Sequence, residues 1–159
     1  MQPQVYIETS VVSYFTGRAS RDVVVAGHQQ ATQDFWALLS DDLVPHVSAL
    51  VVKEAGNGSR EQALKRLDAI SSFAVLRTTT HAEQLAQNIL TAKGVPSEYP
   101  EDALHIAVAA LGGMDFIVTW NFAHINNPFT KMMIRQAVED AGYACPEIVS
   151  PDAFLGDEP

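Results

Sequence analysis

The sequence has little of what would mark a disulfide-rich, zinc-binding or membrane protein. Cys145 is the one cysteine among 159 residues, which excludes an internal disulfide and a zinc site of the CxxC kind. The longest apolar runs, such as residues 23–26 and 106–111, are far too short to span a bilayer. The first residues lack the basic and apolar regions of a secretory signal. We therefore expect a cytoplasmic protein without a membrane association.

Positive charge is also scarce. Ten Lys and Arg residues against 19 Asp and Glu give a net charge of −9, which disfavours contact with a phosphate backbone. The imbalance is uneven, however, because residues 53–77 contain five basic and three acidic residues. Lys53 and Arg60 lie in this stretch. They either contact a nucleic acid or belong to the ordinary solvated face of a helix.

Short β-prone runs alternate with helical patterns along the chain. This order predicts a parallel sheet with helices on both faces, in a single domain of residues 1–159 whose last residues, 153–159, form a frayed acidic tail. An apolar fraction of 47% is enough to fill the core of such a domain. The expected strands are residues 5–7, 43–47, 73–76, 116–119 and 148–149, and the clearest expected helices are residues 11–15, 31–39 and 101–111.

Four oxygen-bearing side chains lie near one edge of this predicted sheet. Glu8 directly follows the first strand, Asn121 follows the fourth, and Asp102 lies in the first turn of the helix that leads into the fourth. Ligands of open parallel sheets bind beyond the carboxyl ends of the strands. Glu54 lies further along its helix and reaches the same point only if that helix is tilted. Oxygen donors of this kind favour Mg²⁺ or Mn²⁺, which support phosphodiester chemistry.

Four segments of the chain resemble a known family. They are IETS after the first strand, the lone Glu54 on the helix after the second, DALHIA at a helix start and TWNFAHI after the fourth strand. Together they resemble PIN domains, and in particular the VapC-type ribonuclease toxins of prokaryotic toxin–antitoxin systems. The resemblance spans residues 5–149, and the stretch EDALHIAVAALGGMDFIVTWNFAHI is its most specific part. It implies a three-layer α/β/α fold with strand order 3-2-1-4-5, Mg²⁺- or Mn²⁺-dependent cleavage of RNA, an antitoxin partner and a homodimer.

The resemblance also assigns roles to the four residues. Glu8, Glu54 and Asp102 match the family's metal-binding acids, and Asn121 falls where the family often has a fourth. Glu8 and Asp102 are expected to hold the ion directly, and Glu54 to orient or deprotonate the attacking water. Two departures are notable, because the first position is usually Asp and the fourth is here an amide. They favour an alternative hypothesis, in which a catalytically weakened PIN-like scaffold binds RNA or a protein.

Several other residues have two possible roles. Thr9 and Ser10 either cap the first helix or orient the ligands beside Glu8. Trp120 either stacks on a base or packs at the rim of the core, and His124 either contacts RNA or packs its own loop. His105 shares a helix face with Asp102, and we expect it to be buried and hydrogen-bonded rather than catalytic. A flavodoxin-like receiver domain also gathers acids, but it needs an Asp at a central strand end, where this chain has Glu8 and Asn121.

Overall fold

A parallel five-stranded sheet organises the computed structural model, which describes residues 2–156. Its strand order, β3-β2-β1-β4-β5, confirms the order that the family resemblance implies. Each neighbouring pair is parallel. All five carboxyl ends therefore meet at one edge. The strands are β1 (Gln4–Ile7), β2 (Val44–Ser48), β3 (Ala74–Leu76), β4 (Phe116–Val118) and β5 (Glu147–Val149).

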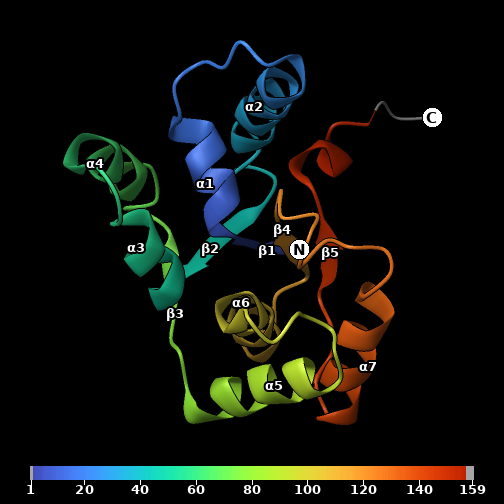
Figure 1. The fold of residues 1–159 in the computed structure, drawn as a ribbon. Helices are drawn as coiled ribbons and strands as arrows, with labels where there is room; N and C mark the ends of the chain where they lie inside the picture. Colours follow the sequence, from blue (N-terminus) through green and yellow to red (C-terminus); the bar gives the residue numbers. More distant parts are fainter. Residues whose placement is uncertain (1, 157–159) are drawn as a thin grey trace.

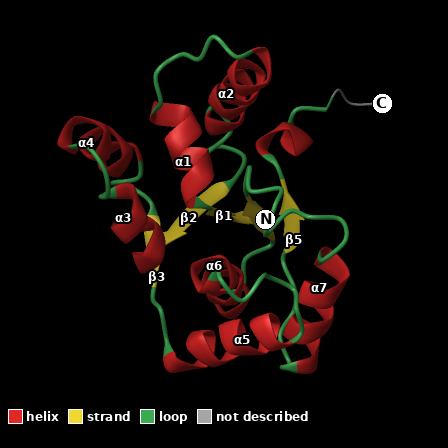
Figure 2. Cartoon of the chain, in the orientation of Figure 1, coloured by secondary structure: helices red, strands yellow, loops and turns green. Residues whose placement is uncertain are grey.

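Helices cover both faces of this sheet, as expected for a three-layer α/β/α fold. In Figures 1 and 2, α1 and α2 lie on one side, α5, α6 and α7 lie on the other, and α3 and α4 stand near the β3 edge. None of the helices within residues 2–156 is long and apolar enough to cross a lipid bilayer. Their bounds are α1 Thr9–Thr16, α2 Val23–Trp36, α3 Ala49–Ala55, α4 Arg60–Ala69, α5 Thr80–Thr91, α6 Pro100–Leu111 and α7 Lys131–Asp140.

The core lies between the central strands and the helices packed on them. Val5, Tyr6 and Ile7 of β1 are fully buried, because this central strand is covered on both faces. Seven of the twelve residues of α6 are buried as well. Residues 5–7 and α6 are the elements that carry Glu8 and Asp102. The acids of the predicted site are therefore anchored to the most enclosed parts of the molecule.

Side-chain hydrogen bonds determine where two of the helices begin, and one of them begins earlier than expected. The helix predicted over residues 31–39 begins at Val23, because Asp22 caps it by accepting a hydrogen bond from the Val25 N–H at 3.0 Å. This cap outweighs the poor helix propensity of three successive valines. The helix α7 begins at Lys131. The Asn127 side chain accepts a hydrogen bond from the Phe129 N–H, which forms a turn before α7.

The first residues of the predicted tail overlap a short helix. Residues 151–154 form a short 3₁₀ helix, η1 (Pro151–Phe154). The ring of Phe154 lies 5.3 Å from that of Phe35 and 5.1 Å from that of Phe116, measured between centroids. Phe154 is thus partly buried and packed against the core, whereas Ala153 is exposed. Residues 157–159 of the predicted tail lie outside the described residues.

Candidate metal centre

The site lies at the carboxyl edge of the sheet, where β1 and β4 end side by side. The register of these strands pairs Ile7 with Val118 and so brings the following residues, Glu8 and Thr119, together. The Thr119 hydroxyl donates a hydrogen bond of 2.6 Å to Glu8 Oε1. Glu8 is 5% exposed, which is unusual for an acid. The topology alone therefore places a buried carboxylate at the point where ligands of such sheets bind.

Glu8 itself caps α1. Its Oε2 accepts a hydrogen bond from the Ser10 N–H at 3.0 Å, and its Oε1 accepts one from the Ser10 hydroxyl at 2.5 Å. The expectation that Thr9 or Ser10 caps this helix is therefore wrong, because the carboxylate that precedes them reaches the free N–H first. The Ser10 hydroxyl instead holds the Glu8 carboxylate in place.

Glu54 lies in the last turn of α3 and reaches the same region. Its Oε1 accepts two hydrogen bonds, one of 2.6 Å from the Thr9 hydroxyl and one of 2.7 Å that joins it to His105 Nε2. The side chain remains 29% exposed. Glu54 thus faces both solvent and the buried histidine, and Thr9 orients it in the way that Ser10 orients Glu8.

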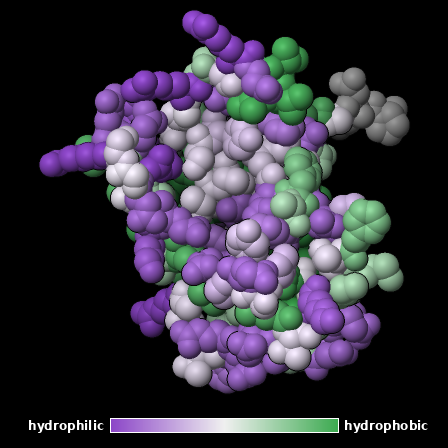
Figure 3. Space-filling view, in the orientation of Figure 1, coloured by the Kyte–Doolittle hydropathy of each residue, from purple (hydrophilic) through white to green (hydrophobic). Residues whose placement is uncertain are grey.

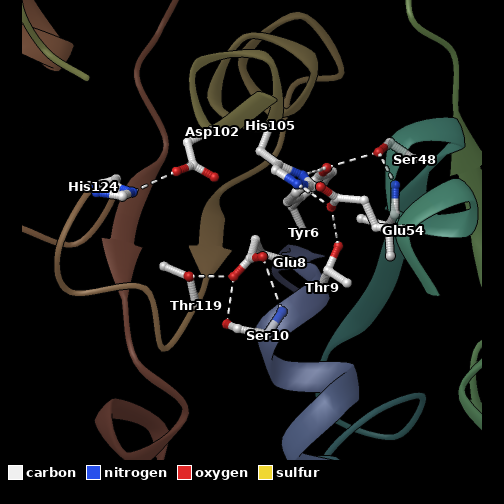
Figure 4. A network of polar contacts seen from close by, with 11 residues as sticks. Tyr6, Glu8, Thr9, Ser10, Ser48, Glu54, Asp102, His105, Thr119 and His124 are labelled. Carbon is white, nitrogen blue, oxygen red and sulfur yellow. Dashed lines mark hydrogen bonds and ion pairs between the residues drawn. The ribbon is translucent and has the colours of Figure 1, made fainter. Parts of the chain in front are cut away.

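A chain of buried polar groups supports Glu54 from behind. His105 Nδ1 lies 2.6 Å from the Tyr6 hydroxyl, which lies 2.8 Å from Ser48 Oγ (Figure 4). His105 is 1% exposed and Tyr6 is fully buried, which confirms the expectation of a buried, hydrogen-bonded histidine. Burial raises the pKa of Tyr6 well above its usual range, so this hydroxyl stays neutral. The chain fixes the ring of His105, and through it the carboxylate of Glu54.

His105 and Glu54 form an ion pair. Burial alone would lower the pKa of His105, but the hydrogen bond to Glu54 and the charges of Glu8, Glu54 and Asp102 together raise it. Burial alone would raise the pKa of Glu54, but the hydrogen bonds from His105 and Thr9 and the positive charges nearby lower it. Both shifts favour the charged forms, so the imidazolium neutralises part of the negative charge gathered at this edge.

These shifts predict a pH-dependent stability. Because the folded pKa of His105 lies above its ordinary value of 6.5, the stabilisation is complete below about pH 6.5 and is lost as the pH rises through the folded pKa. Urea unfolding in EDTA between pH 6 and 9 should show a declining free energy of unfolding. His105→Gln, which cannot titrate, should be less stable at pH 6 and show a flatter profile. Parallel profiles for the two proteins would contradict the ion pair.

Asp102 enters the site from the first turn of α6. Its Oδ2 lies 2.9 Å from His124 Nδ1. The loop after β4 places this histidine, because Asn121 Oδ1 accepts a hydrogen bond of 3.0 Å from the His124 N–H. The amide oxygen of Asn121 is therefore engaged in the loop. Among the described residues, Glu8 and Glu54 form one close group with His105, Asp102 pairs with His124, and Asn121 acts on the site through the position of His124.

The predicted nucleic-acid contacts differ in their surroundings. Trp120 is 7% exposed, its ring stacks on His28 at a centroid distance of 4.0 Å, and its Nε1 donates to Thr32 Oγ1 at 2.8 Å. These contacts favour the packing explanation for Trp120, because neither its face nor its N–H is available to a base. Lys53 and Arg60 are both exposed. Lys53 adjoins Glu54 and helps to lower its pKa, whereas Arg60 begins α4, away from α6 in Figure 1.

The carboxylates fit a hard divalent cation. In Figure 4, Glu8, Glu54 and Asp102 point toward a shared space, and each carboxylate is held mainly through one oxygen. Within residues 2–156, Glu54 Oε2 and Asp102 Oδ1 have no hydrogen-bond partner, and Glu8 Oε2 has only a backbone N–H. Atoms of Glu8, Glu54 and His105 all lie within 4.8 Å of one another. Because both nitrogens of His105 are already hydrogen-bonded, the oxygens form the donor set that Mg²⁺ or Mn²⁺ prefers.

Sequence reasoning missed three contributors to this site. Thr119 follows β4 directly and therefore lies nearer to Glu8 than Asn121 does, which its position in the sequence already indicates. Tyr6 and Ser48 lie in or beside strands that were assigned to the core. A buried Tyr hydroxyl needs a hydrogen-bond partner, so Tyr6 in an otherwise apolar strand was an available signal for a polar chain behind the site.

Comparisons with known proteins support the fold. No protein-family model and no curated protein matches the sequence. Among solved structures, the VapBC2 complex from Rickettsia felis, bound to a DNA fragment from its promoter, has a chain that aligns with a TM-score of 0.55 and 17% identity, covering 76% of this chain and 89% of that one. VapC20 from Mycobacterium tuberculosis, a toxin that cleaves the sarcin–ricin loop, aligns with a TM-score of 0.56 and 17% identity. This alignment covers 88% of the present chain and 96% of VapC20. The chain therefore has the PIN-domain fold of VapC-type toxins.

Proposed function

We propose that the protein is a Mg²⁺- or Mn²⁺-dependent endoribonuclease that cleaves RNA in the cytoplasm as the toxin of a toxin–antitoxin pair. One observation carries this proposal. Glu8, Glu54 and Asp102, from three distant segments, turn their carboxylates toward one space at the carboxyl edge of a PIN-type sheet. Within residues 2–156, no Lys or Arg forms an ion pair with any of the three. A cluster of carboxylates without such partners is an arrangement that a divalent cation stabilises.

Each residue has a distinct task in this proposal. Glu8 and Asp102 hold the ion, and the hydroxyls of Ser10 and Thr119 keep Glu8 oriented for it. When bound, a divalent cation lowers the pKa of a water and offsets negative charge that builds up on the phosphate. Glu54, with its free Oε2, orients the attacking water and accepts its proton. His105 keeps Glu54 in the ionised form that can accept a proton. We expect products with a 5′-phosphate and a 3′-hydroxyl.

The direct experiment incubates the purified protein with single-stranded RNA under three conditions: with MgCl₂, with MnCl₂, and with EDTA. We expect cleavage in the presence of either ion and none in EDTA, with the 5′-phosphate detected by its sensitivity to phosphatase. Cleavage that persists in EDTA, or a lack of cleavage with both ions and several RNAs, would contradict the proposal.

A second candidate function is a binding module on the same scaffold. The observation that favours it concerns the fourth position. Asn121 is an amide whose Oδ1 is engaged in the loop, so the site has three carboxylates instead of four. A Mn²⁺ titration by isothermal calorimetry separates the two candidates. A nuclease binds the ion at the predicted acids, whereas a module that has lost catalysis shows weak binding that Asp102→Asn does not change.

The proposed partner is an antitoxin. The VapBC2 structure from Rickettsia felis is a complex of this kind, although the similarity to the present chain is one of fold. A short reading frame directly upstream of the gene, overlapping it or nearly so, is the genomic sign that we expect. Co-expression of its product should restore growth to cells that express the toxin.

We also propose a homodimer formed by the start of α7. Phe129 and Met132 are 86% and 81% exposed, and they flank a groove of about 430 Å³ that Ala92 and Ala137 help to line. Figure 3 shows apolar side chains projecting on the side where α7 lies in Figure 1. A projecting ring beside a groove can pair with a second copy about a two-fold axis, because each copy supplies both parts.

Light scattering tests this interface. The wild-type protein should have the mass of a dimer, and Met132→Glu should shift it to a monomer, because the change places a charge in an apolar contact. Leu64→Glu on α4, where the side chain is also exposed, serves as the control and should stay dimeric. A monomeric wild-type protein would contradict the proposal.

A further inference from the structure

An exposed aromatic ring stands at the rim of the carboxylate cluster. Tyr99 precedes α6 directly and is 46% exposed. Its ring stacks on the imidazole of His124, with the centroids 3.8 Å apart and the planes inclined by 28°. The side chain makes no capping hydrogen bond at the helix start. Large aromatic side chains usually bury most of their surface, so a half-exposed ring beside polar active groups indicates a contact surface.

The position of this ring is fixed relative to the acids. The carbonyl of Tyr99 accepts a hydrogen bond from the Asp102 N–H at 3.1 Å, which places the two residues on the same turn. His124, behind the ring, is bonded to Asp102 through Nδ1 and to Asn121 through its N–H. Tyr99, His124 and Asp102 therefore form one connected unit. A planar group stacked on Tyr99 would be linked to Asp102 through this unit.

Because the protein is acidic overall, an aromatic surface could contribute much of its affinity for RNA. With a net charge of −9, contacts to phosphates contribute less than in a basic nuclease. Stacking of bases on aromatic rings does not depend on protein charge. It accepts any base, and each stacked base changes affinity by roughly five- to 100-fold. Flipped or single-stranded bases are the usual partners of exposed Tyr and His rings in RNA-binding proteins.

From this geometry we propose that Tyr99, backed by His124, is a stacking subsite for a base of the RNA that flanks the scissile phosphodiester. The inference rests on the proposed nuclease function and adds a site for the substrate. Phe122 is the natural comparison, because it is 47% exposed and lies on the same loop as His124. Its ring lies beside Trp120 and His28, with centroid distances of 6.0 and 6.2 Å, whereas the ring of Tyr99 stacks on the histidine that is bonded to Asp102. The subsite therefore belongs to Tyr99.

The test uses 12-nucleotide RNAs of random sequence that carry 2-aminopurine at one defined position. Fluorescence of this base is quenched when it stacks, and Ca²⁺ in place of Mg²⁺ slows cleavage during the titration. Wild-type protein should quench the probe at one or two positions. Tyr99→Leu should abolish this quenching and weaken binding roughly five- to 100-fold. Tyr99→Phe, which retains the ring, and Phe122→Leu should both behave like the wild type.

Cleavage of an abasic RNA separates stacking from support of the site. If Tyr99 stacks on a base, Tyr99→Leu raises KM on intact RNA, and removal of the stacked base cancels the difference between variant and wild type. If Tyr99 only holds His124, the variant lowers kcat on both RNAs, which would overturn the inference. Equal quenching by wild type and Tyr99→Leu would overturn it as well, while cleavage by both would leave the nuclease function standing. A wild-type protein that neither binds nor cleaves RNA would remove the function and the subsite together.

Discussion

Asp102→Asn should abolish RNA cleavage and leave the fold intact. The change removes one negative charge and one oxygen ligand from the cluster but preserves the shape of the side chain. A divalent cation supplies several kcal/mol of transition-state stabilisation, so the loss of a ligand should lower kcat/KM by about 1,000-fold or more. Fixed-time cleavage of a labelled RNA with 1 to 10 mM Mg²⁺ measures this loss.

Stability provides the control for this variant. Asp102 is 19% exposed, and an Asn side chain can keep the hydrogen bond to His124, so little stability should be lost there. Removal of a charge from a cluster of acids partly offsets even that loss. The thermal midpoint should therefore change little, and circular dichroism should be unchanged. Full cleavage activity in a folded Asp102→Asn protein would refute the assignment of the site.

Glu54→Gln should separate catalysis from ion binding. Because Glu54 is proposed to act on the attacking water, we expect kcat to fall by about 100- to 10,000-fold. Mn²⁺ affinity should fall much less than in Asp102→Asn, because Glu8 and Asp102 remain. The variant should also lose about 1–3 kcal/mol of stability, since the hydrogen bond to the charged His105 is replaced by a neutral one.

His105→Gln is the matched comparison for Glu54→Gln. It removes the same ion pair from the other side and leaves the carboxylate in place. If the loss of activity in Glu54→Gln came only from a disturbed fold, both variants would lose activity in proportion to their loss of stability. A Glu54→Gln protein that keeps its full kcat would show that the carboxylate does not act on the attacking water.

The sheet and its edge could be predicted because they depend on local patterns. Short apolar runs alternating with helices determine a parallel sheet, and a parallel sheet places Glu8 and Asp102 at one edge whatever the loops do. The same reasoning also predicts that Thr119 lies beside Glu8, although the prediction from the sequence named Asn121 instead. The residue nearest to Glu8 across the strand pair is the one directly after β4, and Asn121 lies two residues beyond it.

The site contacts that could not be predicted depend on which of several nearby side chains reaches a given hydrogen-bond or stacking partner. Which side chain caps α1 is decided by reach, and the Glu8 carboxylate bonds to the Ser10 N–H although Thr9 and Ser10 are common capping residues. Whether Asn121 faces an ion or its own loop is decided by a single hydrogen bond to the His124 N–H. The stacking of Tyr99 on His124 joins residues 25 positions apart, and no local pattern indicates it.

Diffraction from crystals soaked in MnCl₂, collected at the manganese absorption edge, shows whether the three acids share a divalent ion. We expect an anomalous peak in the space between Glu8, Glu54 and Asp102, within bonding distance of oxygens of Glu8 and Asp102 and absent in crystals of Asp102→Asn. Carboxylates that turn away from one another, with no peak among them in the wild-type crystals, would contradict the proposal that these acids share a divalent ion.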